Sequence, residues 1–164
     1  WTEDRIVKDC LETFYNNKTL VLRNPDATRP WQHVIEPLTG YLILIQKLCS
    51  NKGAEFEGPW NFGPSLKQNL KVRKLVNIFK IKMNSRSKIA IKRNYKKFKK
   101  IKIFESKHLN INSKKVNEYL SWKPVLSIKE AVSLTVNWYN AFKQNKNLIK
   151  ISQEQISDYF KKIN

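Results

Sequence analysis

The side chains best suited to chemistry in this sequence are two arginines on a turn, and they point to binding rather than catalysis. Arg23 and Arg29 flank Asn24-Pro25-Asp26, which predicts a turn. A guanidinium is planar and can donate two parallel hydrogen bonds to neighbouring oxygens. Two arginines placed in this way predict a clamp for a diphosphate. Two surface arginines without a ligand are the alternative, and the residues alone leave both interpretations open.

Two further side chains are candidates for ligand contact. Asn61 lies between Trp60 and Phe62 in a run that predicts a short buried strand. A buried amide needs hydrogen-bond partners, which could belong to a ligand or to a neighbouring loop. Trp31 could stack on a base or a sugar, although filling the core is the more frequent role of an indole. The predicted binding residues are therefore Arg29, Asn61, Arg23 and Trp31.

The sequence contains no recognisable catalytic machinery. It has no glycine-rich phosphate loop and no Ser-His-Asp arrangement. The histidines are His33 and His108 and the cysteines are Cys10 and Cys49, so the spacing of metal ligands is missing and no metal site is predicted. Both cysteines are expected to be buried and reduced, as in a cytoplasmic protein. No catalytic residue is predicted.

The elements that must position these residues are mostly helices. Apolar periodicity predicts helices over 4–15, 35–49 and 72–79, with a short helix over 113–119. Short strands are expected at 19–23 and 31–34. Two capping-box patterns, Ser127-x-x-Glu130 and Ser152-x-x-Gln155, predict the starts of two more helices. We therefore expect an α/β protein that is mostly helical and has few short strands.

The predicted helix over 35–49 is apolar nearly all round between Gly40 and Ile45. Such a helix needs cover on both faces, which a parallel sheet in an α/β fold provides. We expect that sheet to lie outside this chain, so the chain alone should expose apolar surface and tend to aggregate. The longest apolar run, 41–45, is far below the ~20 residues that span a bilayer, and no membrane partner is expected.

Positive charge is concentrated in one segment of the chain. The net charge is +19, and residues 67–107 hold 16 of the 32 Lys and Arg with a single acid, Glu105. Within this segment, 80–105 is basic and poorly patterned, so we expect a loop with at most one turn of helix, followed by a strand over 100–105. A basic patch can bind polyanions. The alternative is a compositional bias, because Lys, Asn and Ile dominate the whole chain.

Several stretches of the sequence share a family resemblance. The longest includes Arg-Pro-Trp-Gln-His-Val-Ile-Glu-Pro-Leu at 29–38. The matching stretches are Trp1–Val7, Arg23–Leu42, Trp60–Pro64, Leu120–Pro124 and Thr135–Tyr139. They resemble the CDP-glucose 4,6-dehydratases, which are members of the extended short-chain dehydrogenase/reductase superfamily. The resemblance extends over nearly the whole chain and is weakest over about 80–105.

The resemblance implies an NAD-dependent lyase that converts CDP-D-glucose to CDP-4-dehydro-6-deoxy-D-glucose and water, for deoxysugars of surface polysaccharides. It places this chain, 1–164, in the carboxyl-terminal substrate-binding half. The Rossmann half, with the NAD site and the catalytic residues, would precede Trp1, so the chain alone should be inactive. Arg29 and Asn61 match positions near the diphosphate. The chain departs from the family pattern at Lys8, usually proline, and at Ser121, usually glycine.

Two functions follow from these observations. The favoured one is a dehydratase fragment whose partners are a nucleotide sugar and the missing Rossmann half, with a homodimer compatible with the full-length enzyme. The alternative is a basic nucleic-acid-binding protein without catalysis. This is less favoured, because aromatic residues do not alternate with the lysines as they do on stacking surfaces for single strands.

Overall fold

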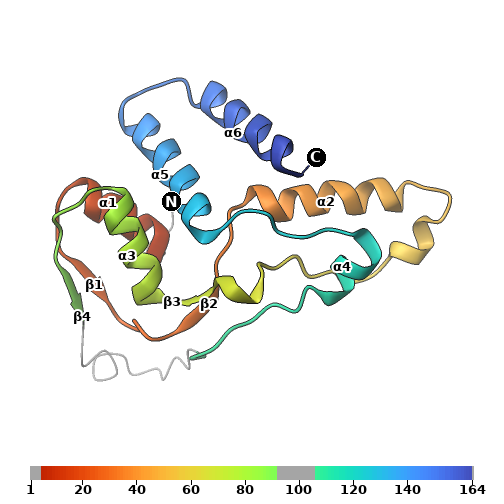
Figure 1. Ribbon diagram of the computed structural model, residues 1–164, viewed down its shortest axis with the longest axis horizontal. Helices are drawn as coiled ribbons and strands as arrows, with labels where there is room; N and C mark the ends of the chain where they lie inside the picture. Colours follow the sequence, from red (N-terminus) through yellow and green to blue (C-terminus); the bar gives the residue numbers. More distant parts are fainter. Residues whose placement is uncertain (1–4, 92–105, 164) are drawn as a thin grey trace, which may run out of the picture.

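The fold is built mostly of helices, joined by strands of three residues each (Figure 1). The computed structural model describes residues 5–91 and 106–163. The elements in order are α1 (Ile6–Tyr15), β1 (Leu20–Leu22), β2 (Thr28–Pro30), α2 (Ile35–Leu48), the 3₁₀ turns η1 (Gly53–Phe56) and η2 (Leu66–Gln68), β3 (Asn69–Lys71), α3 (Val72–Lys82), β4 (Ile89–Ile91), α4 (Lys114–Leu120), α5 (Ile128–Lys143) and α6 (Leu148–Ile163). The expected mostly helical α/β class is confirmed.

The strands of the described residues form two separate pairs. β1 pairs with β4 in parallel, and β2 pairs with β3 antiparallel, with Arg29 opposite Leu70. A single parallel bridge between Thr28 and His108 brings the chain beyond residue 105 alongside β2. β2 therefore has a neighbouring chain segment on each side. These neighbours fix the backbone of residues 23–36, which we call the arginine-bearing turn.

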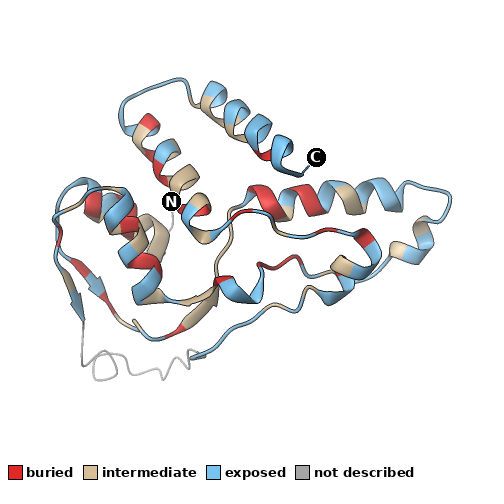
Figure 2. Ribbon diagram, viewed as in Figure 1, coloured by how far each residue is buried: buried red, intermediate tan, exposed pale blue. Residues whose placement is uncertain are grey.

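Three apolar clusters hold these elements together (Figure 2). The largest joins α1, β1, α3 and α5 around side chains such as Phe14, Val76 and Val136. The second surrounds Phe62 and Trp122, and packs against α2. The third joins Ile35 of α2 to Tyr159 of α6. The first turns of α2 therefore pack against α6 at Tyr159 and against the segment around Phe62.

Three strand predictions were wrong or fall outside the described residues. The second strand is Thr28–Pro30 rather than 31–34, and the run around Asn61 forms no strand. The loop expected from residue 80 included one turn of helix, which agrees with the end of α3 at Lys82, but the strand β4 at Ile89–Ile91 was not expected. Residues 92–105, with the strand expected over 100–105, lie outside the described part of the chain.

Helix α2 confirms the predicted helix and its unusual surface. Its buried face approaches Phe62 so closely at Gly40 that a Cβ there would collide with the phenyl ring. The opposite face exposes Leu38, Tyr41, Leu42, Ile45 and Leu48, which share one side of the helix by their spacing. We call these five residues the α2 face. Its four aliphatic side chains are 39–61% exposed in the described chain, whereas the ring of Tyr41 also packs edge-on against Phe62.

The starts of the last two helices differ in how well the sequence predicted them. The capping box of α5 is confirmed, because Ser127 Oγ accepts from Glu130 N–H and the Glu130 carboxylate accepts from Ser127 N–H. The second box is wrong: Ser152 lies within α6, which begins at Leu148. There Asn147 Oδ1 accepts from the Lys150 N–H, 3.0 Å away, and Ser152 Oγ accepts from the indole of Trp138.

The cysteines are both free, but only Cys10 is buried. Burial raises the pKa of the Cys10 thiol well above its usual range, so this group stays protonated. Cys49, just after α2, is exposed, and the expectation that it is buried was wrong. No helix in the described ranges is long and apolar enough to cross a membrane.

Candidate binding site

Arg29 lies in the middle of β2 and is half-buried. Its Nη1 group donates to the carbonyl oxygen of Thr28 at 2.8 Å and to that of Ser106 at 2.9 Å. One carbonyl belongs to β2 itself and the other to the neighbouring segment after residue 105, and together they hold the guanidinium in place. A guanidinium whose plane is fixed loses little further freedom when it binds an oxyanion.

The segment with Arg29 and the segment with Asn61 are joined by one hydrogen bond. Gln32 Nε2 donates to the carbonyl oxygen of Phe62 at 2.8 Å, across 30 positions of sequence. Residue 32 follows Arg29 by three positions, and Phe62 is the neighbour of Asn61. The structure therefore brings together the two segments that the sequence singled out.

The individual candidates differ in their surroundings. Asn61 is exposed, so the expected buried amide was wrong, whereas its neighbour Phe62 is buried. Arg23 is half-buried just after β1. Trp31 packs against the largest apolar cluster, and its indole N–H donates to the carbonyl of Leu70 at 2.9 Å. This geometry suits the packing role of Trp31 better than stacking on a ligand.

Glu36 attaches the start of α2, which follows the arginine-bearing turn, to a distant segment of the chain. This side chain is 1% exposed, and its Oε1 accepts from the N–H groups of Val125 at 2.7 Å and Leu126 at 2.8 Å. Its own carbonyl accepts from the indole of Trp122. Burial raises the pKa of Glu36, while the two N–H groups act in the opposite direction. The start of α2 is thereby fastened to the segment that leads into α5.

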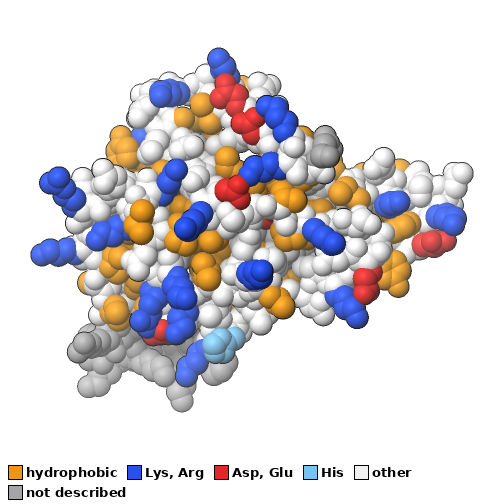
Figure 3. Space-filling model, in the orientation of Figure 1, with side chains coloured by type: hydrophobic (Ala, Val, Ile, Leu, Met, Phe, Trp, Pro, Cys, Tyr) orange, Lys and Arg blue, Asp and Glu red, His pale blue; other side chains and the backbone are white. Residues whose placement is uncertain are grey.

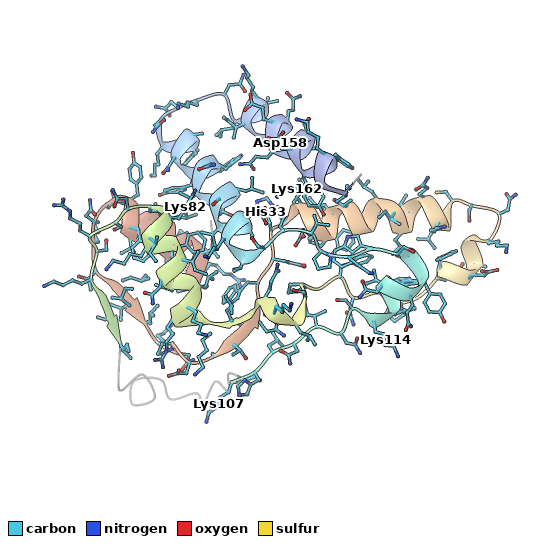
Figure 4. All side chains as sticks on the ribbon, viewed as in Figure 1. His33, Lys82, Lys107, Lys114, Asp158 and Lys162 are labelled. Atoms are coloured by element: carbon cyan, nitrogen blue, oxygen red, sulfur yellow. The ribbon has the colours of Figure 1, made fainter. Side chains whose placement is uncertain are left out.

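Positive charge surrounds the outer end of β2. Asp26 pairs with Arg73 and with Lys71, and their hydrogen bonds, that from Arg73 first, lower the pKa of the Asp26 carboxyl. In Figure 3, Lys and Arg side chains gather near this end of the molecule. His108 Nδ1 lies 3.0 Å from Thr28 Oγ1, and Lys107 is labelled at the same edge in Figure 4. An anionic ligand at β2 would meet a favourable potential.

His33 lies inward of this edge, between the start of α2 and α5 (Figure 4). Its Nδ1 accepts from the N–H of Ile35 at 3.3 Å, and burial lowers the pKa of its imidazole. The ring is therefore neutral at physiological pH and has a structural role at the helix start. The described residues contain no group of three or more His, Cys, Asp or Glu side chains that could hold a metal ion.

Comparisons with known proteins show which enzymes the chain is similar to. No protein-family model matches the chain. The chain is 32% identical, over 160 residues, to the CDP-glucose 4,6-dehydratase of Salmonella typhimurium, and the match covers 97% of this chain. The chain is homologous to CDP-glucose 4,6-dehydratase. The match covers 42% of the length of the Salmonella enzyme, so the chain spans less than half of that homologue.

A solved structure shares the fold. RMD from Pseudomonas aeruginosa, determined in complex with NADPH, superposes with a TM-score of 0.62 and 16% sequence identity. The superposition covers 83% of this chain and 42% of RMD. The chain therefore shares the fold of part of RMD.

Sequence reasoning missed the two side chains that assemble the site. Both Gln32 and Glu36 were noticed only as members of the 29–38 stretch. A carboxylate on the buried face of an apolar helix is a usable signal, because it must find donors inside the protein. The partners of Glu36, however, lie about ninety positions away, and no local pattern identifies them.

Proposed function

We propose that this chain supplies the nucleotide-sugar half of an NAD-dependent CDP-glucose 4,6-dehydratase. The reaction converts CDP-D-glucose to CDP-4-dehydro-6-deoxy-D-glucose and water. The observation that carries the proposal is the Gln32–Phe62 hydrogen bond, because it joins the segments of Arg29 and Asn61 in a chain homologous to that enzyme.

In this proposal the chain binds and orients the substrate. Arg29, with its plane set by the carbonyls of Thr28 and Ser106, donates to the diphosphate oxygens. Asn61, exposed beside the buried Phe62, donates its amide hydrogens to the same group, and Arg23 adds positive charge. Holding the diphosphate fixes the position of the sugar, and such orientation supplies much of an enzyme's rate.

The residues of this chain do not fit a dinucleotide. Its four glycines, at 40, 53, 58 and 63, do not form a Gly-x-Gly-x-x-Gly loop. Within the described ranges the one parallel strand pair, β1 with β4, carries no such loop. NAD would therefore be bound by the part of the enzyme to which this chain has no match. That part would also be the chain's principal partner, and this chain alone would be inactive.

A chimera tests the function. This chain replaces the 160 matching residues of the Salmonella typhimurium enzyme, and formation of the 4-keto sugar nucleotide is measured by mass spectrometry. We expect CDP-glucose to be converted, and this chain by itself to convert none. A folded, NAD-loaded chimera that leaves CDP-glucose unchanged, or converts only another nucleotide sugar, would contradict the proposal.

Nucleic-acid binding is the second candidate, and the +19 net charge is the observation in its favour. It requires tight association with random oligonucleotides that weakens steeply as salt is raised. The described basic edge argues against a strong patch, because Lys71 and Arg73 are both paired with Asp26.

A further inference from the structure

A sizeable apolar pocket lies among the helices, away from the basic edge. Its volume is about 470 Å³, it is partly open to solvent, and it is lined by side chains of α1, α3, α5 and α6 together with the segment 31–35 and Leu38 of α2. This is within the usual size range of ligand-binding pockets. Trp31 and Trp138 contribute indole rings, and most of the remaining lining is aliphatic or aromatic.

The chemistry of the lining excludes a charged occupant. No Lys, Arg, Asp or Glu is among the described residues that line the pocket. Three of its polar side chains are bonded within the protein: Thr135 donates to the carbonyl of Ala131, Ser152 accepts from Trp138, and Gln155 donates to the carbonyl of Leu134. A diphosphate buried here would have no countercharge. The pocket is therefore separate from the diphosphate site proposed above.

Gln32 contributes a polar atom to the lining that has no partner in the described chain. Gln32 Oε1 is buried and has no hydrogen-bond partner among the described residues, whereas Gln32 Nε2 is bonded to Phe62. A buried carbonyl-type oxygen favours an occupant that supplies a donor such as a backbone N–H. The pocket thus suits a largely apolar polypeptide segment.

The mouth of the pocket is continuous with the α2 face. Val34, Leu38 and Ile156 line the pocket and are also exposed, by 61%, 49% and 45%. Leu38 belongs to both surfaces. From there the apolar strip continues along α2 through Leu42 and Ile45. One partner could therefore cover the strip and enter the pocket together.

A second copy of this chain is a poor fit for this surface. The α2 face offers five exposed apolar residues on each copy, whereas a standard stable interface uses about 20–30 residues and about 800 Å² per partner. Such a dimer would also leave the pocket unfilled. In contrast, the homologue has more than half of its length outside the region matched by this chain, and that portion is available to cover both surfaces.

We propose that the pocket is a socket for apolar side chains of the other half of the enzyme, which docks along the α2 face. The inference rests on the proposed function for the identity of the partner. The occupant is an uncharged, apolar segment that carries at least one backbone donor near Gln32. Docking fills the pocket and fixes the segment 31–35, and with it the arginine-bearing turn.

The first test asks what enters the pocket. Benzene is the probe, because dry apolar cavities bind it. We expect benzene to shift the indole N–H signals of Trp31 and Trp138 in NMR spectra of this chain. The signal of Trp122, which lies in another apolar cluster, should not change. Adding the separately expressed amino-terminal half of the Salmonella typhimurium enzyme should expel the benzene. Expulsion by CDP-glucose alone, or retention of benzene in the complex, would overturn the proposal.

The second test uses substitutions and measures the dissociation constant of the two halves. Ala131→Leu, which fills the pocket from α5, should weaken association at least tenfold while raising the melting temperature of the chain by about 2–4 °C. Ala141→Leu is the matched control: it is buried on the same helix outside the pocket, and should lower the melting temperature by overpacking.

A second pair of substitutions tests the α2 face. Leu42→Glu should also weaken association at least tenfold, and Ile149→Glu, at an exposed apolar site of α6, should not. Any of three results would refute the proposed docking. These are unchanged binding with Ala131→Leu, no binding of the unaltered chain, and a homodimer that is abolished by Leu42→Glu. An inactive chimera would contradict the proposed function alone, since these association measurements do not depend on turnover.

Discussion

At the scale of single residues, the arginine-bearing turn is positioned by side chains that would never contact a ligand. Gln32 fixes it against Phe62, and Glu36 fastens the following helix to the segment at 125–126. Arginine chemistry suggested Arg29 as a candidate from the sequence alone. Its supports could not be predicted, because each hydrogen bond joins residues far apart in the chain.

Removing the Glu36 carboxylate should destabilise the protein. Glu36→Ala leaves the buried N–H of Leu126 without its acceptor, and an unsatisfied buried donor costs about 1–3 kcal/mol. Urea denaturation of the isolated chain measures the change. Glu118→Ala is the control, because Glu118 is exposed and its pair with Lys114 is a surface contact, so the effect should stay within about 0.5 kcal/mol. Equal stabilities of both variants would refute the anchoring role.

Glu130 predicts a pH dependence. Its hydrogen bond with Lys162, and next that from the Ser127 N–H, lower the pKa of Glu130 from 4.5 to about 2. A carboxyl whose pKa is lowered by folding stabilises the folded state above its ordinary pKa, and this contribution disappears as pH falls through the folded value. Stability from Glu130 should therefore be complete above about pH 4.5 and lost by about pH 2.

The variant Glu130→Gln tests this, because glutamine can still accept from Ser127 but carries no charge. Its melting temperature should lie below that of the unaltered chain at pH 6, and the difference should close between pH 4.5 and 2. Glu118→Gln, at an exposed site, should show no such convergence. A difference that is constant across pH would show that the charge of Glu130 is not involved.

At the scale of elements, the end of α4 shows what one departure from the family pattern costs in stability. Ser121, where the family usually has glycine, has φ of 52°, in the left-handed region. Side chains with a Cβ rarely adopt this conformation, and it costs about 1–2 kcal/mol. Glycine would fit the C-cap of α4 without this cost.

Ser121→Gly should accordingly raise the free energy of unfolding by about 1 kcal/mol. Ser65→Gly provides the contrast, since Ser65 has φ of −60° and glycine there only adds freedom to the unfolded chain. That variant should be slightly less stable than the parent. The comparison is made by chemical denaturation, and destabilisation by Ser121→Gly would refute the strain at this cap.

Helices could be predicted from the sequence more fully than strands. The helix over 35–49 and the capped start of α5 have long apolar periodicity and local caps, and both are confirmed. The strand at Ile89–Ile91 was missed because three residues in a basic run carry little pattern, and its pairing partner, β1, lies about seventy positions earlier. The wrong box at Ser152 has a similar cause: Asn147 offered an earlier cap, and Ser152 instead accepts from Trp138.

At the scale of the whole molecule, one surface is basic and another is apolar. The basic edge surrounds β2, and the α2 face lies on an element that is buried only on its other side. The sequence predicted this uncovered face, because a helix that is apolar all round requires two layers of cover. It could not predict the apolar pocket, which is assembled from four helices and the segment 31–35.

The measurement that tests the central claim most directly is the Michaelis constant of the chimera for CDP-glucose. With Arg29→Ala and Asn61→Ala together, we expect this constant to rise at least tenfold, because the diphosphate loses its donors. The matched pair Arg86→Ala and Asn77→Ala, both exposed and away from the turn, should leave it unchanged. If the chimera with both site substitutions turned over CDP-glucose with the parent's Michaelis constant and rate, the turn at 23–36 and Asn61 would not be part of the sugar-nucleotide site.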